Sequence, residues 1–465
     1  MIKIDKIQLN NFRFFTDDKE HNSFELNGNN MLLYGENGSG KSSLFKAFEF
    51  LAQTEITEND FNENRNIFNL NEESYLKFEF DNNENLCIDK KHLSFDNAFV
   101  ENLSLINPFV DYKKLLYINF TTNSDYKKIN IFPILEKLFE KYPIDLDKKI
   151  VLKDIKNPNE KLEKLEKIID NLKEDINLFL SKFSNEFYID RFIYTTDYVP
   201  LTKNLGLNNI LEFVVNIDIS FQDKKIKEYQ NFLNEARLSA LGISIYFAII
   251  KHLSNQFEKN NLKILVLDDL LISLDMSNRL NLIGILKNEF SDFQIFFFTH
   301  DKGFFEILKD KMRWKAYEIY VAKDNDCEKP HIKKSLNYFE SAKKYFKEYD
   351  YPACANYLRK EVESLKKKKE AQELSINEDK KVFKKIKKML LITDLMDDEK
   401  KGQIIGKLRG FKTAFEDETD TVIEIDLKNI KSITDRILNP QSHDDTSKPL
   451  YKKELEEAIN ILAIC

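Results

Sequence analysis

The segment at residues 35–43 constrains the fold of this chain more than any other. It reads Gly-Glu-Asn-Gly-Ser-Gly-Lys-Ser-Ser and fits the spacing G-x-x-x-x-G-K-[ST] at every fixed position. Residues 30–34 before it predict a short buried strand, and residues 44–52 after it predict an amphipathic helix. Three of the 11 glycines in 465 residues lie in this one turn. A glycine-rich turn between strand and helix predicts an α/β fold.

This turn has the composition of a phosphate-binding loop, or P-loop. Glycines allow several backbone N–H groups to converge on phosphate oxygens at the positive end of the helix dipole. We expect Lys41 to reach the β- and γ-phosphates of a nucleotide and Ser42 to hold Mg²⁺. The predicted nucleotide-binding residues of the turn are Gly35, Glu36, Asn37, Gly38, Ser39, Gly40, Lys41, Ser42 and Ser43.

Composition narrows the class of protein. Hydrophobic residues make up 42% and charged residues 32%, and the net charge is −7, so nucleic acid would have to bind at local basic patches. The four cysteines form no C-x-x-C pair, which favours neither a zinc site nor a disulfide framework. Residues 1–5 predict a strand rather than a signal peptide, and the apolar run at 241–250 is too short to cross a bilayer. We therefore expect a cytoplasmic protein without a membrane segment.

Hydrophobic periodicity changes along the middle of the chain. Apolar residues at intervals of three and four over 162–180 predict a short amphipathic helix or a small coiled arm. Alternation over 215–221 predicts a strand, and residues 231–241 open a long apolar helix. Two later apolar runs predict buried parallel strands that end on polar residues, the first on Asp268 and Asp269 and the second on His300.

These segments, in this order, resemble the ATPase heads of the SMC, RecF and RecN group within the ABC superfamily. The resemblance covers residues 1 to about 325. It rests on Asn11-Phe12-Arg13, the P-loop, Asp268-Asp269, Ser273-Leu274-Asp275 and His300. It implies an ABC-type P-loop ATPase head with a mixed sheet, a helical lobe and a short helical arm at about 133–200. It also implies ATP and Mg²⁺ as ligands, and a homodimer or higher oligomer joined through the heads.

The resemblance assigns roles residue by residue. Asp268 is similar to the Walker B aspartate that positions Mg²⁺, together with Ser42. Asp269 stands where the family usually has a glutamate that orients the attacking water, so its shorter side chain is expected to slow hydrolysis. Asp275 is similar to the D-loop aspartate, and His300 to the switch histidine that contacts the γ-phosphate. The implied catalytic residues are therefore Lys41, Asp269 and His300.

Two family motifs are not matched. In the signature segment, Glu235 aligns with the family's glutamate, but Phe232 falls on the expected serine and Asn234 on a glycine. Either Asn234, Glu235 and nearby backbone groups contact the nucleotide of a second protomer, or activation across the dimer is altered. No Q-loop glutamine stands out, and residues 111–113 are the best candidate for that switch.

After about residue 328 the pattern is helical and rich in charge, which predicts a head at 1–328 and an α-helical domain at 329–465. That domain resembles HEPN domains, a helical family that includes ribonucleases. Six residues separate Arg436 from His443, and Arg359 and Glu363 share a helix face. In metal-free RNA cleavage, the histidine would act as acid or base and arginine would stabilise developing charge. The alternative is a domain that only docks a partner.

A lysine-rich stretch at 359–388 is either a site for nucleic-acid phosphates or a solvated helix face. The leading hypothesis is an ATP-switched anti-phage defence effector that senses nucleic acid or a phage signal. It would control a nuclease, either its own helical domain or a partner protein. The rivals are a RecF-like DNA-repair ATPase and an ATPase scaffold without a nuclease role.

Overall fold

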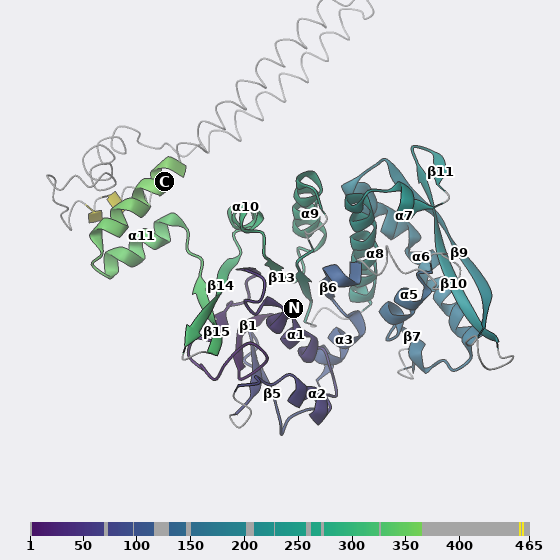
Figure 1. Cartoon of the computed structure of the whole chain (residues 1–465), viewed down its shortest axis with the longest axis horizontal. Coiled ribbons are helices and arrows are strands. Elements are labelled where there is room, and N and C mark those ends of the chain that lie inside the picture. Colours follow the sequence, from purple (N-terminus) through teal and green to yellow (C-terminus); the bar gives the residue numbers. More distant parts are fainter. Residues whose placement is uncertain are drawn as a thin grey trace, which may run out of the picture. The chain divides into compact units, whose positions relative to one another are not determined.

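The computed structural model of the chain forms two compact units, Met1–Ser335 and Leu336–Cys465 (Figure 1). The structure describes residues 2–68, 73–95, 97–115, 130–145, 150–200, 209–226, 228–256, 262–270, 274–324, 327–364, 455, 456, 458 and 459. The first unit extends past the predicted boundary at 328. The reason is that the last strand of its sheet, Cys327–Lys334, pairs with the strand before it.

The first unit mixes strands and helices. Its described strands are β1 (Ile4–Asn10), β2 (Ser23–Glu25), β3 (Met31–Gly35), β4 (Tyr75–Phe80), β5 (Asn85–Asp89), β6 (Phe109–Asp111), β7 (Pro143–Asp145), β8 (Ile150–Val151), β9 (Phe187–Pro200), β10 (Asn209–Phe221), β11 (Lys224–Ile226), β12 (Ile264–Asp268), β13 (Gln294–Thr299), β14 (Lys315–Asp324) and β15 (Cys327–Lys334). Its described helices are α1 (Lys41–Leu51), α2 (Glu58–Glu63), α3 (Ala98–Ile106), α5 (Phe132–Phe139), η1 (Leu152–Asp154), α6 (Pro158–Phe183), α7 (Tyr229–Phe232), α8 (Glu235–Asn255), α9 (Met276–Glu289) and α10 (Lys302–Met312).

The central sheet has the strand order β15-β14-β3-β13-β12-β6. β14, β3, β13, β12 and β6 run parallel, and only β15 is antiparallel to its neighbour. This confirms the predicted α/β fold with a mixed sheet. β3, β12 and β13 are buried along their whole length, as their continuous apolar runs predict. Because the strands are parallel, the residues that follow them meet at one edge of the sheet.

A second, antiparallel sheet, β2-β1-β4-β5, lies across α1 from the central sheet. Phe48 of α1 joins the two layers, since its ring centroid is 5.9 Å from that of Phe78 on β4 and 4.4 Å from that of Phe296 on β13. Gln294 adds a polar link, because its side chain donates to the carbonyl of Ile4 and accepts from the Ile4 N–H. The P-loop helix is thus fixed on both sides.

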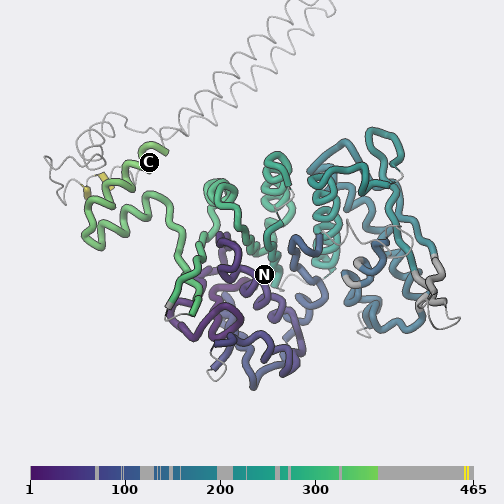
Figure 2. The backbone as a smooth tube through the Cα atoms, in the orientation of Figure 1, coloured from purple at the N-terminus to yellow at the C-terminus, as the bar shows by residue number. Residues whose placement is uncertain are grey.

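The remaining lobe is built from α6, α8, α9 and the sheet β11-β10-β9, which the blue and teal tube follows in Figure 2. α6 does not project as an arm. Its apolar face is buried against α8 and β9, because leaving that stripe in water would forfeit its hydrophobic stabilisation. The buried residues of α6 include Leu165, Ile169, Leu172, Ile176 and Leu180. The alternation over 215–221 is confirmed as part of β10.

α8 is the apolar core helix of this lobe. Among the described residues, only Glu235–Asn255 is long and apolar enough to cross a membrane by length and composition. In the structure, 78% of the relevant window is buried inside the protein. Its hydrophobicity is therefore accounted for by the core.

The described part of the second unit is helical. α11 (Tyr338–Lys347) begins with a capping box between Asn337 and Glu340. It packs with the helical residues 351–364 around a small core that includes Ala342, Cys354, Leu358 and Val362. The lysines from 366 to 388 lie outside the described residues.

Candidate active site

The P-loop has a backbone conformation that requires its glycines. A Cβ on Gly35 would lie 2.3 Å from Ser39 Oγ and 2.5 Å from Ile319 Cγ2. Gly38 and Gly40 have φ angles of +85° and +109°, in the region that disfavours other residues. The loop therefore folds tightly around the start of α1, as its sequence predicts.

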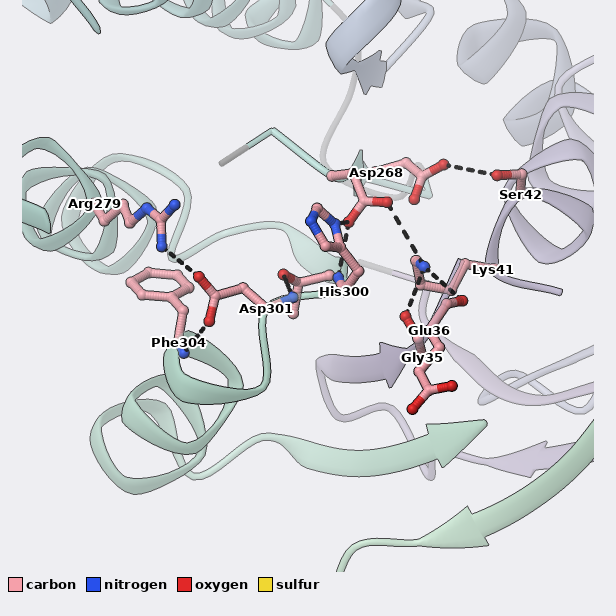
Figure 3. Close-up of polar contacts among 11 residues, drawn as sticks. Gly35, Glu36, Lys41, Ser42, Asp268, Arg279, His300, Asp301 and Phe304 are labelled. Carbon is pink, nitrogen blue, oxygen red and sulfur yellow. Dashed lines mark hydrogen bonds and ion pairs between the residues drawn. The ribbon is translucent and has the colours of Figure 1, made fainter. Parts of the chain in front are cut away.

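Lys41 is held inside this loop (Figure 3). Its side chain is 5% exposed, and its Nζ donates to the carbonyl oxygens of Gly35 at 2.7 Å and Glu36 at 3.2 Å. The same Nζ lies 3.7 Å from Asp269 Oδ2. The side chain of the predicted phosphate-binding lysine is thus buried and in contact with Asp269, the residue after β12.

Ser42 and Asp268 form the candidate magnesium site. Ser42 Oγ donates to Asp268 Oδ2 at 3.4 Å. Asp268 is 6% exposed, and its Oδ1 is buried with no hydrogen-bond partner in the described chain. Burial, and then the charge of Asp269, raises the pKa of Asp268 to about 7. A buried carboxylate oxygen without a partner, beside a serine hydroxyl, fits a hard cation such as Mg²⁺.

Asp269 links Lys41 to His300. Its Oδ1 accepts the backbone N–H of His300 at 2.9 Å and lies 2.9 Å from the His300 Nδ1. A carboxylate only accepts hydrogen bonds, so the ring proton of this contact belongs on Nδ1. Asp269 has a left-handed φ of +52°, and its N–H donates to the carbonyl of Phe298. The sequence pattern predicts that Asp269 and His300 lie at one edge of the sheet, but it does not predict the hydrogen bond between them.

A comparison with known protein families shows to which family the chain belongs. The family model described as "AAA domain, putative AbiEii toxin, Type IV TA system" matches residues 31–306, which include the P-loop, both aspartates and His300. The chain belongs to this family. No curated protein matches it.

Solved structures with a similar fold have low sequence identity to this AAA-domain protein. An SMC head bound to the C-winged helix domain of ScpA has a TM-score of 0.42 at 12% identity, covering 71% of this chain and 98% of that one. The SMC head domain from Thermotoga maritima has a TM-score of 0.37 at 14% identity, covering 72% and 99%. RecF has a TM-score of 0.37 at 13% identity, covering 71% and 98%. The match to the family model, and not these structures, carries the assignment of residues 31–306 to an AAA domain.

In this AAA-domain protein, Asp275 caps a helix. Its Oδ1 accepts the backbone N–H of Asn278 at 2.8 Å and so starts α9. Ser273 lies outside the described residues. The D-loop role of Asp275 stays a prediction.

Arg279 and Asp301 form a contact that sequence reasoning missed. Arg279 Nη1 lies 2.5 Å from Asp301 Oδ2, and its Nε donates to the carbonyl of Leu274 at 2.8 Å. Asp301 also caps α10 by accepting the N–H of Phe304 (Figure 3). The pair ties the start of α9 to the residue after His300. The one available signal was the position of Asp301, directly after the predicted switch histidine.

The signature segment precedes and begins α8. Asn234 caps the helix, since its Oδ1 accepts the N–H of Arg237 at 2.9 Å. Glu235 is the first helical residue and is exposed. Phe232 is 55% exposed, and its ring centroid lies 5.2 Å from that of Phe221. The side chain of Asn234 therefore serves its own helix, and contact of Asn234 or Glu235 with a nucleotide stays a prediction.

Asp111 ends β6, directly beside Asp268 in the parallel register. Its Oδ1 accepts the N–H of Lys114 at 2.8 Å. The candidate Q-loop thus begins at the same sheet edge as the other site residues.

The described structure includes two of the four residues of the predicted nuclease site, Arg359 and Glu363. Arg359 Nε lies 2.8 Å from Glu363 Oε1, an ion pair four residues apart on one helix. Arg436 and His443 lie outside the described residues. The predicted ribonuclease site stays a prediction.

Proposed function

We propose that this protein hydrolyses ATP in a Mg²⁺-dependent reaction and that its nucleotide state switches an effector of anti-phage defence. The observation that carries the proposal is the series of contacts Lys41–Asp269–His300, beside the Ser42–Asp268 pair. Such a concentration of charge at the carboxyl edge of a parallel sheet, next to a P-loop, suits phosphoryl transfer to water.

Each residue has a role that follows from its position. Lys41 exchanges its contacts with loop carbonyls for phosphate oxygens when a nucleotide binds. Asp269 accepts a hydrogen bond from the attacking water and orients it. His300, held by Asp269 through Nδ1, presents Nε2 toward the γ-phosphate. The short side chain of Asp269 is shared with His300 and Lys41, which favours slow turnover.

Ser42 and Asp268 would hold the magnesium ion. When bound, Mg²⁺ neutralises charge on the β- and γ-phosphates. Asp268 provides a carboxylate oxygen that makes no other hydrogen bond in the described structure. Among the described residues, no cluster of three or more His, Cys, Asp or Glu side chains could hold a metal ion. The pair therefore relies on phosphate oxygens and water to complete the coordination, as is usual for Mg²⁺.

The second half of the site comes from another copy of the chain. The start of α8 presents Glu235 and the exposed ring of Phe232 outward. In a two-fold dimer, that surface of each protomer faces the P-loop of the other, with ATP between them. ATP then closes the dimer and hydrolysis opens it.

The effector function is supported by the description of the family, which names a toxin of a toxin–antitoxin system. We propose that the switch acts in the cytoplasm and senses nucleic acid or a phage signal. The target is a nuclease, either a partner protein or the second unit through Arg359, Glu363, Arg436 and His443.

Expression in a bacterial host tests this function. Wild-type protein is expected to be toxic when activated by phage or by its neighbouring gene products, and Lys41→Ala is expected to abolish that toxicity. If the second unit is itself the nuclease, His443→Ala is expected to abolish toxicity and RNA cleavage while ATPase activity stays intact. If His443→Ala is harmless and removal of residues 336–465 loses a bound partner, the second unit docks the effector. DNA binding without toxicity would favour the repair rival.

A further inference from the structure

A buried carboxylate outside the candidate active site joins three parts of the first unit. Glu318 on β14 has a side chain that is 10% exposed. Its Oε1 accepts from Ser335 Oγ at 2.6 Å, its Oε2 lies 3.0 Å from Lys302 Nζ, and the hydroxyl of Tyr320 also donates to it. Burial acts to raise the pKa of Glu318, but these hydrogen bonds and the charge of Lys302 hold it at about 2. Glu318 is therefore ionised at neutral pH.

Lys302 connects this carboxylate to the switch histidine. It is the first residue of α10, two positions after His300. Its Nζ stands 4.6 Å from the ring centroids of both Tyr34 and Phe305, a geometry that adds cation–π attraction to the ion pair. Tyr34 immediately precedes the P-loop and lies opposite Glu318 in the parallel register of β3 and β14. The start of α10 is thus clamped to the strand that carries the P-loop.

Ser335 connects the same carboxylate to the end of the first unit. It is the last residue of that unit, and its N–H donates to the carbonyl of Ala316 at 2.8 Å. Lys309, two turns along α10 from Lys302, donates to Ser335 Oγ at 2.9 Å. The chain that leads into the second unit is therefore held by both β14 and α10.

We infer that Glu318 positions His300 for the reaction and couples the nucleotide site to the linker at Ser335. The inference rests on the proposed ATPase function and adds a route of regulation to it. α10 is a rigid helix, so a shift of His300 toward or away from a phosphate moves Lys302 and Lys309 together. Lys302 is bonded to Glu318 and Lys309 to Ser335. A change at the γ-phosphate consequently changes how firmly the linker is held.

Three variants of the full chain separate these contacts. Glu318→Gln removes the charge and keeps one acceptor oxygen, which serves either Ser335 or Tyr320 but not both. Lys302→Met keeps apolar contact with the rings of Tyr34 and Phe305 but loses the ion pair with Glu318. Because the position is partly exposed, we expect this variant to fold. Ser335→Ala removes the hydroxyl that contacts Glu318 and Lys309, and it keeps the backbone hydrogen bond to Ala316. Lys333→Ala, an exposed position on the same β-hairpin, is the matched control.

Two measurements are made on each variant. The first is steady-state ATP hydrolysis, in which misplacement of His300 lowers kcat by at least about tenfold in Glu318→Gln and Lys302→Met while KM changes less than about twofold. The second is amide hydrogen exchange over 335–340, with and without a non-hydrolysable ATP analogue. The analogue changes exchange there in the wild type and in Lys333→Ala, but not in Ser335→Ala, whose kcat stays within about twofold of the wild type.

The inference would be overturned if Glu318→Gln and Lys302→Met both fold and have a normal kcat. It would also be overturned if the analogue leaves hydrogen exchange of the linker unchanged in the wild type. Either result would leave the ATPase proposal standing. Failure of the wild type to bind the analogue or hydrolyse ATP would overturn both. Loss of kcat together with loss of the linker response in Glu318→Gln supports the coupling. Loss of kcat in the Lys333→Ala control would show a general effect of the β-hairpin and would contradict it.

Discussion

The edge of the central sheet and the start of α8 carry the two halves of the proposed nucleotide site, and they are built in opposite ways. At the sheet edge, Lys41 and Asp268 are 4% and 6% exposed, and their contacts join three elements of one chain. At α8, Asn234 caps its own helix and Phe232 is 55% exposed. The first half is fixed by folding of one chain, whereas the second is exposed, and we propose that it meets a partner.

The largest expected effect comes from removing the cation of the buried half. Lys41→Ala loses the group that contacts the phosphates, and we expect ATP hydrolysis to fall by about 10³-fold or more. Lys46→Ala on the same helix is the matched control, because that lysine pairs with Glu49 on the helix surface. A steady-state phosphate-release assay measures both variants. Normal turnover in Lys41→Ala would show that the P-loop assignment is wrong.

The next largest effect is expected for Asp269→Asn, which separates ATP hydrolysis from ATP binding in the buried half of the site. Asp269→Asn keeps a hydrogen-bond acceptor for the His300 N–H but loses the carboxylate, so we expect kcat to fall by about 10²-fold while ATP still binds. Calorimetric titration of ATP and single-turnover hydrolysis measure the two quantities. Asp17→Asn, at an exposed position, is the control. Loss of ATP binding instead would make Asp269 a structural residue.

Much of the buried half could be predicted from the sequence because its residues follow strands with continuous apolar runs. Parallel strands bring their carboxyl ends together, so the P-loop, Asp268, Asp269 and His300 had to meet at one edge. The contact of Asp269 with His300 could not be predicted, since it depends on a left-handed φ at Asp269. The contacts of Glu318 with Lys302 and Ser335 could not be predicted either, because side chains from β14, α10 and the linker converge only after folding.

The lobe around α8 shows where periodicity alone is ambiguous. The apolar stripe of α6 fitted either a projecting arm or a packed helix, and no local signal separates the two. The presence of α8 and β9 as covering surfaces decides for the packed helix. The signature segment could be aligned, but the use of Asn234 as a helix cap is a local hydrogen bond that the family pattern does not contain.

A smaller effect is expected at the exposed half. Glu235→Arg places a bulky cation at the positive end of the α8 dipole and in front of the surface proposed to meet a partner. We expect ATP-dependent association to weaken by about tenfold in dissociation constant, or about 1.4 kcal/mol. Light scattering in the Asp269→Asn background, with and without ATP, measures it. A monomer mass in both conditions, with Glu235 intact, would rule out the ATP-dependent dimer.

The smallest effect concerns the cap. Asn234→Ala loses the acceptor for the Arg237 N–H, and we expect the free energy of unfolding to fall by about 1 kcal/mol. Urea unfolding followed by circular dichroism measures the change, and Asn234→Asp, which keeps the acceptor, should stay near the wild type. Equal stability of Asn234→Ala and wild type would show that the cap contributes nothing and would free the side chain for another role.

Mixing two defective proteins tests most directly whether the two halves come from different copies. At protein concentrations well above the weakened dissociation constant both variants form dimers, but Asp269→Asn lacks a working buried half and Glu235→Arg lacks a working exposed half, so each alone hydrolyses ATP slowly. In an equal mixture, half of the dimers are mixed and have one intact site out of two, which restores about a quarter of the wild-type rate. That recovery is the predicted result. A mixture whose rate equals only the average of its two components would contradict the account.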